Sequence, residues 1–517
     1  MDVNMVWFCY GLCDEKMLEW LPSILFLTVF TLFLMEEEKS KRMKGIKLPP
    51  GPPKLPLIGN LHLLGNLRHR SLENLSKKYG SIMLLQLGSA TTVIVSSAKT
   101  AQQVLKIHDL YCCTPPSSPG PNRFSYNGLD VLFSPYSDHW KEMRKVFISE
   151  LLSMKRVQSF AYAREAEVDK LITSLSQALP EPVNLNEKIF ALADGIIGTV
   201  AFGKIYGTDQ FKDQVFHNVL GEATKMLVSF SAEDFFPRIG RIIDALTGLS
   251  GRLEKSFHQF DGYLQMVLDQ HLDHARSKPE QEDLVDFLIR LMKDESNSFR
   301  VTENCVKAML FDAFIGGIVT TSTTILWAMS ELIKNPRVMN KVQAEIRNCI
   351  GKKEKVEGKD VAKLKYLKMD VKETFRLQPP VPILPPREAM REFKVGEFDI
   401  LPKTRILVNV WAIGRDPNGW ENPNEFYPER FEGSRIDFRG SDFNLLPFGA
   451  GRRICPGLDM GATNVDFTLA NMLYWFHWEL PNDMKREDIS MEEEGGLACQ
   501  RRTPLWLVPI SNSSQVE

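Results

Sequence analysis

Cysteine is scarce in this sequence and is nowhere arranged as a framework. The 517 residues contain eight cysteines, and no Cys-x-x-Cys pair occurs among them. A disulfide-stapled secreted domain or a zinc ribbon needs denser and more regular spacing. We therefore expect the cysteines to be reduced, and any functional one to act singly. They are Cys9, Cys13, Cys112, Cys113, Cys305, Cys349, Cys455 and Cys499.

Excess charge and phosphate-binding glycine loops are missing as well. The formal net charge is -2, which leaves no electrostatic footprint for a nucleic-acid partner. Neither Gly396 nor Gly414 belongs to a nucleotide-binding glycine pattern, so no nicotinamide site is expected within the chain. The sequence is 44% hydrophobic and 25% charged, which is typical of a large globular enzyme.

One long uncharged run is present, close to the N-terminus. Residues 20–35 carry no charge, and their length approaches the roughly 20 apolar residues that span a bilayer. The flank that follows is basic, which keeps that side in the cytosol. The pattern predicts a single transmembrane helix over residues 18–35, with residues 1–17 on the lumenal side. A buried core helix is the alternative.

A proline-rich segment follows the basic flank. Five of the nine residues 48–56 are proline, which cannot continue a helix. We interpret residues 36–60 as the basic flank and a stiff hinge, although an ordinary proline-rich loop is an alternative. No second linker or repeat follows, so residues 61–517 are predicted to form one catalytic domain.

Helical periodicity dominates that domain. Apolar residues recur at spacings of three and four over residues 150–176, 252–276, 301–334 and 336–350. Short strand patterns cover residues 82–87, 92–95, 406–410 and 505–509, and residues 277–284 are typical of a surface loop. The fold class predicted is mainly α with small β-sheets.

The strongest chemical signal is the segment Phe448-Gly-Ala-Gly-Arg-Arg-Ile-Cys-Pro-Gly, residues 448–457. Its glycines allow close backbone approach and positive φ angles. Backbone N–H groups in such a loop can donate to the sulfur of Cys455 and tune a bound iron. A lone cysteine is usually a small buried hydrophobic residue, but a cysteine in this setting is suited to ligate a metal.

This segment matches the FxxGxRxCxG heme-binding signature of the cytochrome P450 family at every specified position. Three further motifs are similar to those of the family: Glu373 with Arg376, the PERF segment at residues 428–431, and Trp140 with Arg144. The sequence resembles plant microsomal members that act on terpenoids, alkaloids and phenolics. The resemblance implies the cytochrome P450 fold, heme b with Cys455 as axial ligand, and an endoplasmic reticulum membrane enzyme facing the cytosol.

The resemblance also implies roles for individual residues. Glu373, Arg376 and Arg430 correspond to a structural triad, because buried charges need such pairing. Guanidinium and indole groups suit the heme propionates. The implied cofactor-binding residues are Trp140, Arg144, Arg387, Arg453, Phe448, Gly449 and Gly317, with Cys455 on the metal.

The oxygen-activating helix departs from the family pattern. Thr320 matches the family's threonine and is the predicted catalytic residue, but Val319 stands where an acid is usual. Valine cannot carry a proton. Protons are therefore delivered by water at Thr320 or by a polar group of the substrate, or the enzyme catalyses a reaction that needs fewer protons. Gly316 and Gly317 are expected to leave room for dioxygen. A smaller departure is Gln378, where related plant proteins commonly have histidine.

The resemblance implies oxidation of a small hydrophobic plant metabolite, by hydroxylation or epoxidation, with dioxygen and with electrons from an NADPH-dependent flavoprotein reductase. A basic patch including Lys141, Lys145 and Arg452 is the expected reductase-docking surface. Apolar walls suit a hydrophobic ligand, and core packing is the alternative for each wall residue. The predicted substrate contacts are Phe124, Phe314, Ile315, Val319, Val381, Ile383 and Leu497.

Two other functions are considered. A heme-thiolate isomerase, dehydratase or oxidative cyclase without standard oxygen insertion is favoured by Val319. A membrane-bound heme carrier without activity is the second. A zinc site at His271 and His274 is disfavoured, because both are expected on a solvated helix face.

Overall fold

The computed structural model describes residues 45–203, 206–207, 213–276, 282–294, 300–482 and 484–512, with the side chains of 213–217 excluded. The chain divides into two compact units, Met1–Leu48 with Glu397–Asp399, and Pro49–Gly396 with Ile400–Glu517. In the first unit the backbone N–H of Lys47 donates to the Asp399 carboxylate over 2.8 Å. The predicted membrane helix over 18–35 and most of the predicted loop 277–284 lie outside the described residues.

The second unit is predominantly helical. Its longer helices are α3 (Arg68–Tyr79), α6 (Asp138–Val146), α8 (Ala161–Gln177), α9 (Leu185–Phe202), α10 (Asp213–Val228), α13 (Leu249–Leu272), α14 (Leu284–Lys293), α15 (Glu303–Lys334), α16 (Pro336–Ile350), α18 (Lys365–Leu377) and α20 (Leu458–Trp475). Its shorter ones are α4 (Ala98–Gln102), α5 (Pro119–Phe124), α7 (Met154–Ser159), α11 (Ala232–Phe235), α12 (Gly240–Leu246), α17 (Gly358–Val361) and α19 (Val410–Ile413). Single 3-10 turns are η1 (Leu61–Leu63), η3 (Asp109–Tyr111), η6 (Pro428–Phe431), η7 (Gly451–Arg453) and η8 (Arg486–Asp488), and π-helical turns are η2 (Gln103–Ile107) and η4 (Phe147–Leu152).

The strands form small sheets, as the fold class predicts. They are β1 (Ile82–Leu87), β2 (Ala90–Val95), β3 (Val183–Asn184), β4 (Arg387–Glu388), β5 (Phe393–Val395), β6 (Phe398–Ile400), β7 (Arg405–Val408), β8 (Phe476–Glu479), β9 (Glu493–Glu494), β10 (Gln500–Arg501) and β11 (Trp506–Ser511). A four-stranded sheet has the order β1-β2-β7-β4, in which β2 and β7 run parallel. A three-stranded sheet has the order β3-β11-β8, and β9 pairs with β10.

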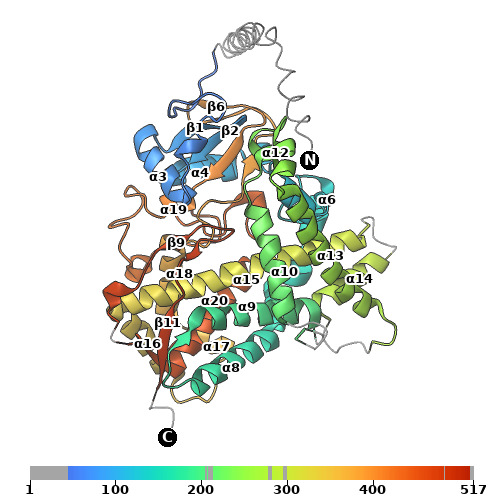
Figure 1. The fold of residues 1–517 in the computed structure, drawn as a ribbon. Helices are drawn as coiled ribbons and strands as arrows, with labels where there is room; N and C mark the ends of the chain where they lie inside the picture. The colour runs from blue at the N-terminus through green and yellow to red at the C-terminus, as the bar shows by residue number, and fades with distance from the viewer. Residues whose placement is uncertain are drawn as a thin grey trace, which may run out of the picture. The chain divides into compact units, whose positions relative to one another are not determined.

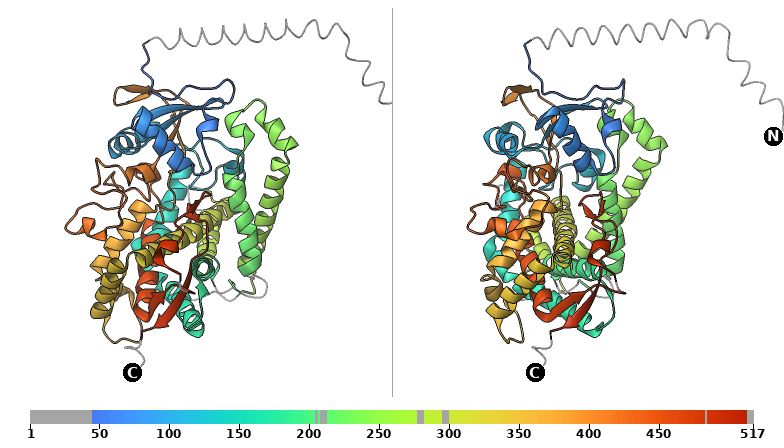
Figure 2. Two further views of the ribbon diagram at one scale, coloured as in Figure 1. Left: turned by 60° about the vertical axis from the view of Figure 1, so that its left-hand side comes forward. Right: turned by 90° about the vertical axis from the view of Figure 1, so that its left-hand side faces the viewer.

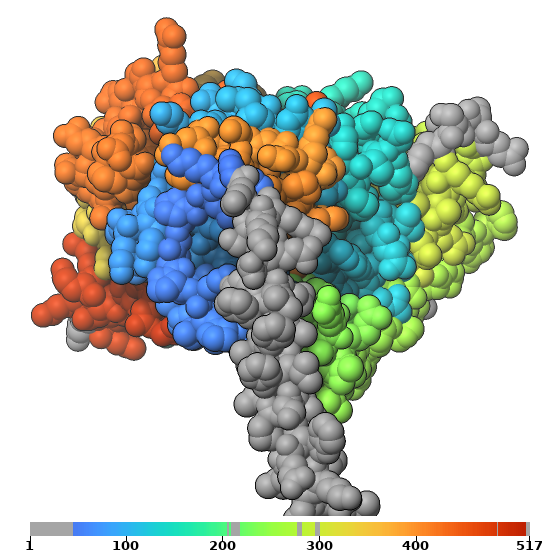
Figure 3. All heavy atoms as spheres, turned by 90° about the horizontal axis from the view of Figure 1, so that it is seen from above, coloured from blue at the N-terminus to red at the C-terminus, as the bar shows by residue number. Residues whose placement is uncertain are grey.

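The four-stranded sheet lies at one end of the second unit, away from most of the helices (Figures 1 and 2). Seen from that end, blue residues of the N-terminal part and orange residues near β7 lie against each other (Figure 3). The pairing of β2 with β7 explains this, since it joins segments more than three hundred residues apart in the sequence. The same sheet carries Arg387 on β4, which brings that residue toward the cysteine loop.

Helix α15 runs through the middle of the helical region (Figure 1) and contacts α9, α14, α16, α18 and α20. Thr302 caps its start by accepting the N–H of Cys305. Among the described helices, α15 alone is long and apolar enough to span a bilayer, but 78% of its most apolar window is buried inside the protein. It is therefore a core helix, and it presents a mid-helix segment to the candidate site.

Helix and strand boundaries differ from the predictions where tertiary contacts decide them. Helix α16 and strand β1 match the predicted ranges. The predicted helix over 150–176 is wrong as a single element, because Ser153 is extended and Phe160 is not helical, which separates η4, α7 and α8. The predicted strand over 406–410 ends at Val408, since Asn409 instead caps α19 by accepting the N–H of Ala412.

The proline-rich segment is part of the second unit from Pro49 onward. The carbonyl of Pro50 accepts the N–H of Leu84 over 2.8 Å, and Asn60 exchanges hydrogen bonds with Gln86. A Cβ at Gly51 would lie 2.0 Å from the Leu84 carbonyl oxygen, so only glycine fits there. The compact unit therefore begins before the predicted boundary at residue 61.

Candidate active site

The cysteine loop takes its shape from glycines. Gly449 and Gly451 have φ angles of 70° and 74°, a region that side chains other than glycine rarely adopt. At Gly451 a Cβ would also lie 2.1 Å from the carbonyl oxygen of Leu105. The N–H of Cys455 donates to the carbonyl of Phe448 over 2.9 Å, which closes the loop. Cys455 is thus held a few residues before α20.

Cys455 lies deep in the fold yet keeps part of its surface accessible. Burial raises the pKa of its thiol, while the N–H of Gly457 and the charge of Arg144 act in the opposite direction. A Cβ at Gly457 would lie 3.9 Å from the Cys455 sulfur, so the backbone approaches the thiol closely. The start of α20 adds positive potential, which favours a thiolate.

Cys499 is the other cysteine with potential metal-ligating neighbours. Its sulfur, His69 and Glu493 have potential ligand atoms within 4.8 Å of one another. Burial and the Glu493 carboxylate raise the pKa of Cys499 to about 12, and that carboxylate already accepts from His69 and Arg70. Burial thus opposes a thiolate at both cysteines; the Gly457 N–H and Arg144 counteract it at Cys455, whereas the Glu493 carboxylate adds to it at Cys499.

Three arginines converge beside the cysteine loop. Arg453 donates to the carbonyls of Cys113, Val131 and Ser134 over 2.8, 3.1 and 2.6 Å. Arg144 donates to the carbonyl of Ile454, next to Cys455, over 2.5 Å. Arg387 donates through one guanidinium nitrogen to Asp109 over 2.6 Å and through another to the Ala450 carbonyl over 3.0 Å.

Trp140 joins this cluster from α6. Its indole N–H donates to the Val131 carbonyl over 2.9 Å, the same oxygen that Arg453 uses. The guanidinium carbon of Arg453 lies 4.1 Å from the Trp140 ring centre, and that of Arg144 lies 5.5 Å away. The structure thus brings together all four side chains that the sequence predicts as propionate contacts.

Positive charge exceeds negative charge in this cluster. Burial, together with the nearby charges of Arg387 and Arg144, lowers the pKa of Arg453 to about 10. Asp109 is engaged by both Arg387 and Arg452, and the hydrogen bonds of Arg144 and Arg453 go to carbonyls. A dianionic group would offset this excess, and a thiolate-ligated heme carries two propionates. The donor set therefore fits heme.

Helix α15 faces the site with small residues. Gly316 is exposed in mid-helix, and no atom lies within 4 Å of where its Cβ would be. Thr320 is half-buried, and its hydroxyl donates to the Gly316 carbonyl over 2.5 Å. Gly317 is different, because a Cβ there would lie 2.5 Å from Ile197 of α9. Gly317 thus allows α15 to pack closely against α9, and its role toward the cofactor and dioxygen stays a prediction.

The triad residues meet behind the site. Glu373 is fully buried, receives two hydrogen bonds of 2.8 Å from Arg376, and receives one of 3.0 Å from Arg430. Arg376 also donates to the carbonyls of Gly414 and Pro423. These bonds join α18 to the segment before η6, so the triad links chain segments that flank the cysteine loop.

The predicted substrate contacts fall into two groups. Phe124 is fully buried and stacks on Phe311 with ring centres 5.1 Å apart, while Phe314 lies 4.8 Å from the ring of Phe202. Ile315 is also buried. All three side chains pack within the hydrophobic core, and their roles as substrate contacts stay predictions. The half-buried members of the set are Val319, Val381, Ile383 and Leu497.

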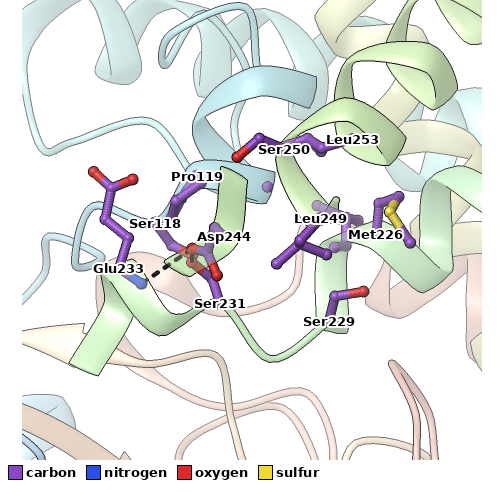
Figure 4. Close-up of a pocket in the computed structure, with 12 residues that line it drawn as sticks. Ser118, Pro119, Met226, Ser229, Ser231, Glu233, Asp244, Leu249, Ser250 and Leu253 are labelled. Carbon is purple, nitrogen blue, oxygen red and sulfur yellow. Dashed lines mark hydrogen bonds between the residues drawn. The ribbon is translucent and has the colours of Figure 1, made fainter. Parts of the chain in front are cut away.

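Two cavities flank this region. A cavity of about 30 Å³ between α5, α10 and α13 has room for about one water and not for an organic substrate. Its polar wall is internally bonded, since Asp244 accepts from Ser231 and from the N–H of Glu233 (Figure 4). A surface cavity of about 330 Å³ contains the predicted docking residues. It is lined by Tyr136, Trp140, Lys141, Arg144, Lys145, Ile148 and Arg452.

The histidine pair differs from its prediction. His274 is exposed, but His271 is buried, with one ring nitrogen 2.7 Å from the Val267 carbonyl and the other 3.2 Å from Asp283. The solvated position expected for His271 is therefore wrong. Arg276 donates to Asp283 and Asp286, the two carboxylates beside His271, so a cation already occupies the place that a metal would need.

Sequence reasoning missed the acidic residues around the cluster. Asp109 binds Arg387 and Arg452, and Asp312 of α15 accepts the N–H groups of Val131 and Leu132. Asp130 accepts the N–H of Phe133. Each is an isolated aspartate in the sequence, and its partners are brought to it only by the fold, so no local pattern signals it.

Solved structures share this fold. The chain aligns with a structure titled "Zebra fish cytochrome P450 another structure with Progesterone" at a TM-score of 0.72 and 25% sequence identity. The alignment covers 85% of this chain and 99% of the zebra fish chain. The mainly helical architecture with small sheets is therefore confirmed as the P450 fold.

The family model described as Cytochrome P450 matches residues 49–508. The chain is 52% identical to 2-methylbutanal oxime monooxygenase from Manihot esculenta, over 95% of this chain and 97% of that protein. It is 51% identical to 4-hydroxyphenylacetaldehyde oxime monooxygenase from Sorghum bicolor, over 95% and 94% of the two chains. The chain belongs to the cytochrome P450 family. It is a monooxygenase, an oxidoreductase that incorporates oxygen, and its cofactor is heme bound through a cysteine thiolate.

Proposed function

We propose that the protein oxidises a small hydrophobic plant specialised metabolite, with Cys455 as the heme ligand and an NADPH-dependent reductase as electron donor. The observation that carries this proposal is the placement of Cys455 beside the Gly457 N–H and Arg144. In the same cluster the hydrogen bonds of Arg144 and Arg453 go to backbone carbonyls, and Arg387 shares Asp109 with Arg452. When bound, heme supplies the activation of dioxygen. The protein's residues supply position, exclusion of water and proton delivery.

Four side chains are proposed to hold the propionates. Arg144, Arg387 and Arg453 offer charge-assisted donors, and Trp140 offers an indole N–H. Their present hydrogen bonds to backbone carbonyls keep them oriented before any ligand arrives. Phe448 and Gly449 are proposed to face the cofactor from the cysteine loop. The ring of Phe448 is supported by Phe375, 5.1 Å away.

Thr320 is the proposed catalytic residue on α15. Its hydroxyl is both donor and acceptor, and it lies one turn from the open space at Gly316. With Val319 beside it, no carboxyl group can relay protons at that position. We propose that water held by the Thr320 hydroxyl delivers the protons.

Oximes are the substrate class that the relatives suggest. The two relatives named above act, by their names, on a branched aliphatic and on a phenolic aldoxime. The half-buried Val319, Val381, Ile383 and Leu497 offer apolar contacts to such molecules. We therefore propose an aldoxime, or a metabolite of similar size and polarity, as substrate.

The surface cavity lined by Lys141, Lys145 and Arg452 is the proposed docking site for the reductase. All three side chains are cationic, so they suit an acidic flavoprotein surface. Arg144 and Trp140 line the same cavity and also contact the cysteine loop region. An electron delivered there has a short path to the cofactor.

We also propose a single-pass anchor over residues 18–35 in the endoplasmic reticulum membrane, with the catalytic domain in the cytosol. Exposed apolar residues on and before α12 support membrane contact by the catalytic domain. Ile242 is 61% exposed, Leu246 is 83% exposed and Ile239 is 56% exposed, which is unusual for a surface in contact with water alone.

The test uses full-length protein in microsomes with a plant NADPH-dependent reductase. Aliphatic and aromatic aldoximes are supplied, and oxidised products are identified by mass spectrometry. The proposal expects product that requires NADPH and oxygen and that contains oxygen from labelled dioxygen. Oxidation of none of the aldoximes, with turnover of terpenes or phenolics instead, contradicts the oxime assignment but not the monooxygenase assignment.

A heme-thiolate isomerase, dehydratase or oxidative cyclase is the second candidate function. Val319 favours it, because such reactions demand fewer delivered protons. The same assay separates these functions. Product formation without net consumption of NADPH or oxygen supports an isomerase or dehydratase, and an oxidised product that gains no oxygen atom from labelled dioxygen supports an oxidative cyclase.

A further inference from the structure

Asp130 and Asp312 form a buried carboxyl pair near the propionate cluster, which is the set of proposed propionate contacts Trp140, Arg144, Arg387 and Arg453. Asp130 lies in the loop before α6, and Asp312 lies on α15. Both side chains are buried. Each carboxyl group acts on the pKa of the other, so the two are neighbours in the fold. No described N–H or O–H group of another residue donates to either Oδ1 atom. Two carboxylates this close cannot both be ionised, so one proton lies between them.

The other oxygen of each carboxyl group holds the same short peptide segment, residues 130–134. Asp312 Oδ2 accepts the N–H groups of Val131 and Leu132 over 2.7 and 3.2 Å. Asp130 Oδ2 accepts the N–H of Phe133 over 2.8 Å. The pair therefore fixes the N–H side of this segment against α15.

The carbonyl side of the same segment faces the cofactor-binding residues. The Val131 carbonyl accepts from Trp140 and Arg453, and the Ser134 carbonyl accepts from Arg453. Residues 130–134 therefore connect the two acids, which bind their N–H groups, to the propionate cluster, which binds their carbonyl groups. The positive charge of Arg453 also acts on Asp130, where it lowers the pKa.

Asp312, Gly316 and Thr320 are spaced by four residues on α15, so they lie along one stripe of the helix. Asp312 is two turns from Thr320, roughly 12 Å along the axis. That distance is too long for direct proton donation. The pair is consequently suited to positioning and not to proton delivery.

We infer that Asp130 and Asp312 share one proton and, as a monoanionic pair, hold residues 130–134 in the conformation that orients Trp140 and Arg453. This rests on the proposed cofactor role of those two side chains. Loss of the shared proton places two like charges together, which separates the loop from α15 and frees the cluster. Burial raises the pKa of Asp130 to about 7, and burial together with the charge of Asp130 raises the pKa of Asp312 well above its ordinary value, so the shared proton is lost on the alkaline side.

The experiment measures heme transfer from the holoprotein to excess apomyoglobin as a function of pH. Two variants are Asp312→Asn and Asp130→Asn, in which an amide N–H replaces the shared O–H. A third is Asp312→Ala, which removes the acceptor of the Val131 and Leu132 N–H groups. The control is Asp244→Asn. Asp244 is also buried and accepts the N–H groups of Ala232 and Glu233, but it lies on α12. Infrared spectra compare the carboxylic-acid C=O stretch of wild type and each asparagine variant.

For wild type and the control, the transfer rate is expected to rise with pH above neutrality, by up to about tenfold per pH unit for one proton lost. Each asparagine variant is expected to transfer heme slowly across the same range, and Asp312→Ala to transfer it about tenfold faster at every pH. The asparagine variants are expected to lose one acid C=O band.

Equal pH slopes in wild type and both asparagine variants overturn the inference, as does an unchanged acid band. These outcomes differ from failure of the proposed function. A protein that binds no heme through Cys455 would still show the infrared change if the acids share a proton, whereas a normal holoprotein without the infrared change leaves the proposed function intact.

Discussion

The guanidinium carbon of Arg453 lies 4.1 Å from the centre of the Trp140 ring, and both side chains donate to the carbonyl of Val131. A planar cation stacked on an indole and fixed by three carbonyls has little freedom left. Such preorganisation reduces the entropy lost when an anionic ligand binds. Arg453 and Trp140 are therefore held in position by the protein's own backbone carbonyls and need no ligand to orient them.

Replacing Arg453 tests this cluster. Arg453→Ala is expected to lower the heme content of the purified protein at least about tenfold, since one charge-assisted donor group contributes roughly 1.5–3 kcal/mol. Arg453→Lys keeps the charge but not the planar guanidinium group, so its heme content is expected to lie between those of wild type and Arg453→Ala. Heme content is measured by the pyridine hemochrome assay. Arg452→Ala is the matched control. Arg452 is adjacent but exposed, and this variant should keep its heme and be reduced more slowly by the reductase.

Glu373→Gln is expected to destabilise the protein by about 3 kcal/mol, because it leaves the buried Arg376 and Arg430 without their shared anion. Thermal unfolding of the holoprotein measures the effect. Glu492→Gln is the control, since that exposed carboxylate pairs with the exposed Arg502 and contributes about 1 kcal/mol or less. Equal losses in the two variants would contradict the structural role of the triad.

Asp370 on α18 is a buried acid without hydrogen-bond partners for either oxygen among the described residues. Burial, together with Glu331 and Glu373, raises its pKa well above the ordinary value. The folded state thus binds a proton that the unfolded state releases above about pH 4. Stability is therefore lost as pH rises from about 4 toward the folded-state pKa.

Asp370→Val is accordingly expected to stabilise the protein by about 1–3 kcal/mol at neutral pH. Thermal unfolding at pH 5 and pH 8 checks this, with the gain over wild type larger at pH 8. Asp370→Asn serves as control, because it removes the titration but keeps a buried polar group. A gain that is equal at both pH values would show that Asp370 does not titrate in this range.

Much of the site was predictable because its motifs are contiguous. The cysteine loop, Glu373 with Arg376, and Trp140 with Arg144 each lie within a few residues, so local chemistry restricts them. Helix α15 begins at Glu303 and ends at Lys334, close to the predicted 301–334. Because α15 is buried on nearly all sides, its sequence is a long apolar stretch that is easy to recognise.

The remaining features depend on partners distant in the sequence. His271 was expected in solvent because its neighbours are polar, but Asp283 and α14 cover it. Gly317 serves contact with Ile197, and Phe124 stacks on Phe311, and neither partner is visible in the local pattern. Asp130 and Asp312 lie far apart along the chain, so only the fold could reveal their pairing.

Val319→Asp supplies an acid beside Thr320. If water at Thr320 limits proton delivery, this variant is expected to raise the amount of product formed per NADPH consumed. Val319→Asn is the matched control, since it has nearly the same shape without acidity. Coupling is measured from NADPH, hydrogen peroxide and product together. Equal coupling in both variants would contradict a proton-delivery limit at this position.

The most direct measurement is the absorption spectrum of the reduced protein with carbon monoxide, recorded for wild type, Cys455→Ala and Cys499→Ala. Wild type and Cys499→Ala should show the thiolate-type band, and Cys455→Ala should lose it. A histidine-type spectrum or a colourless wild-type protein would contradict iron ligation by Cys455, as would loss of the band in Cys499→Ala alone.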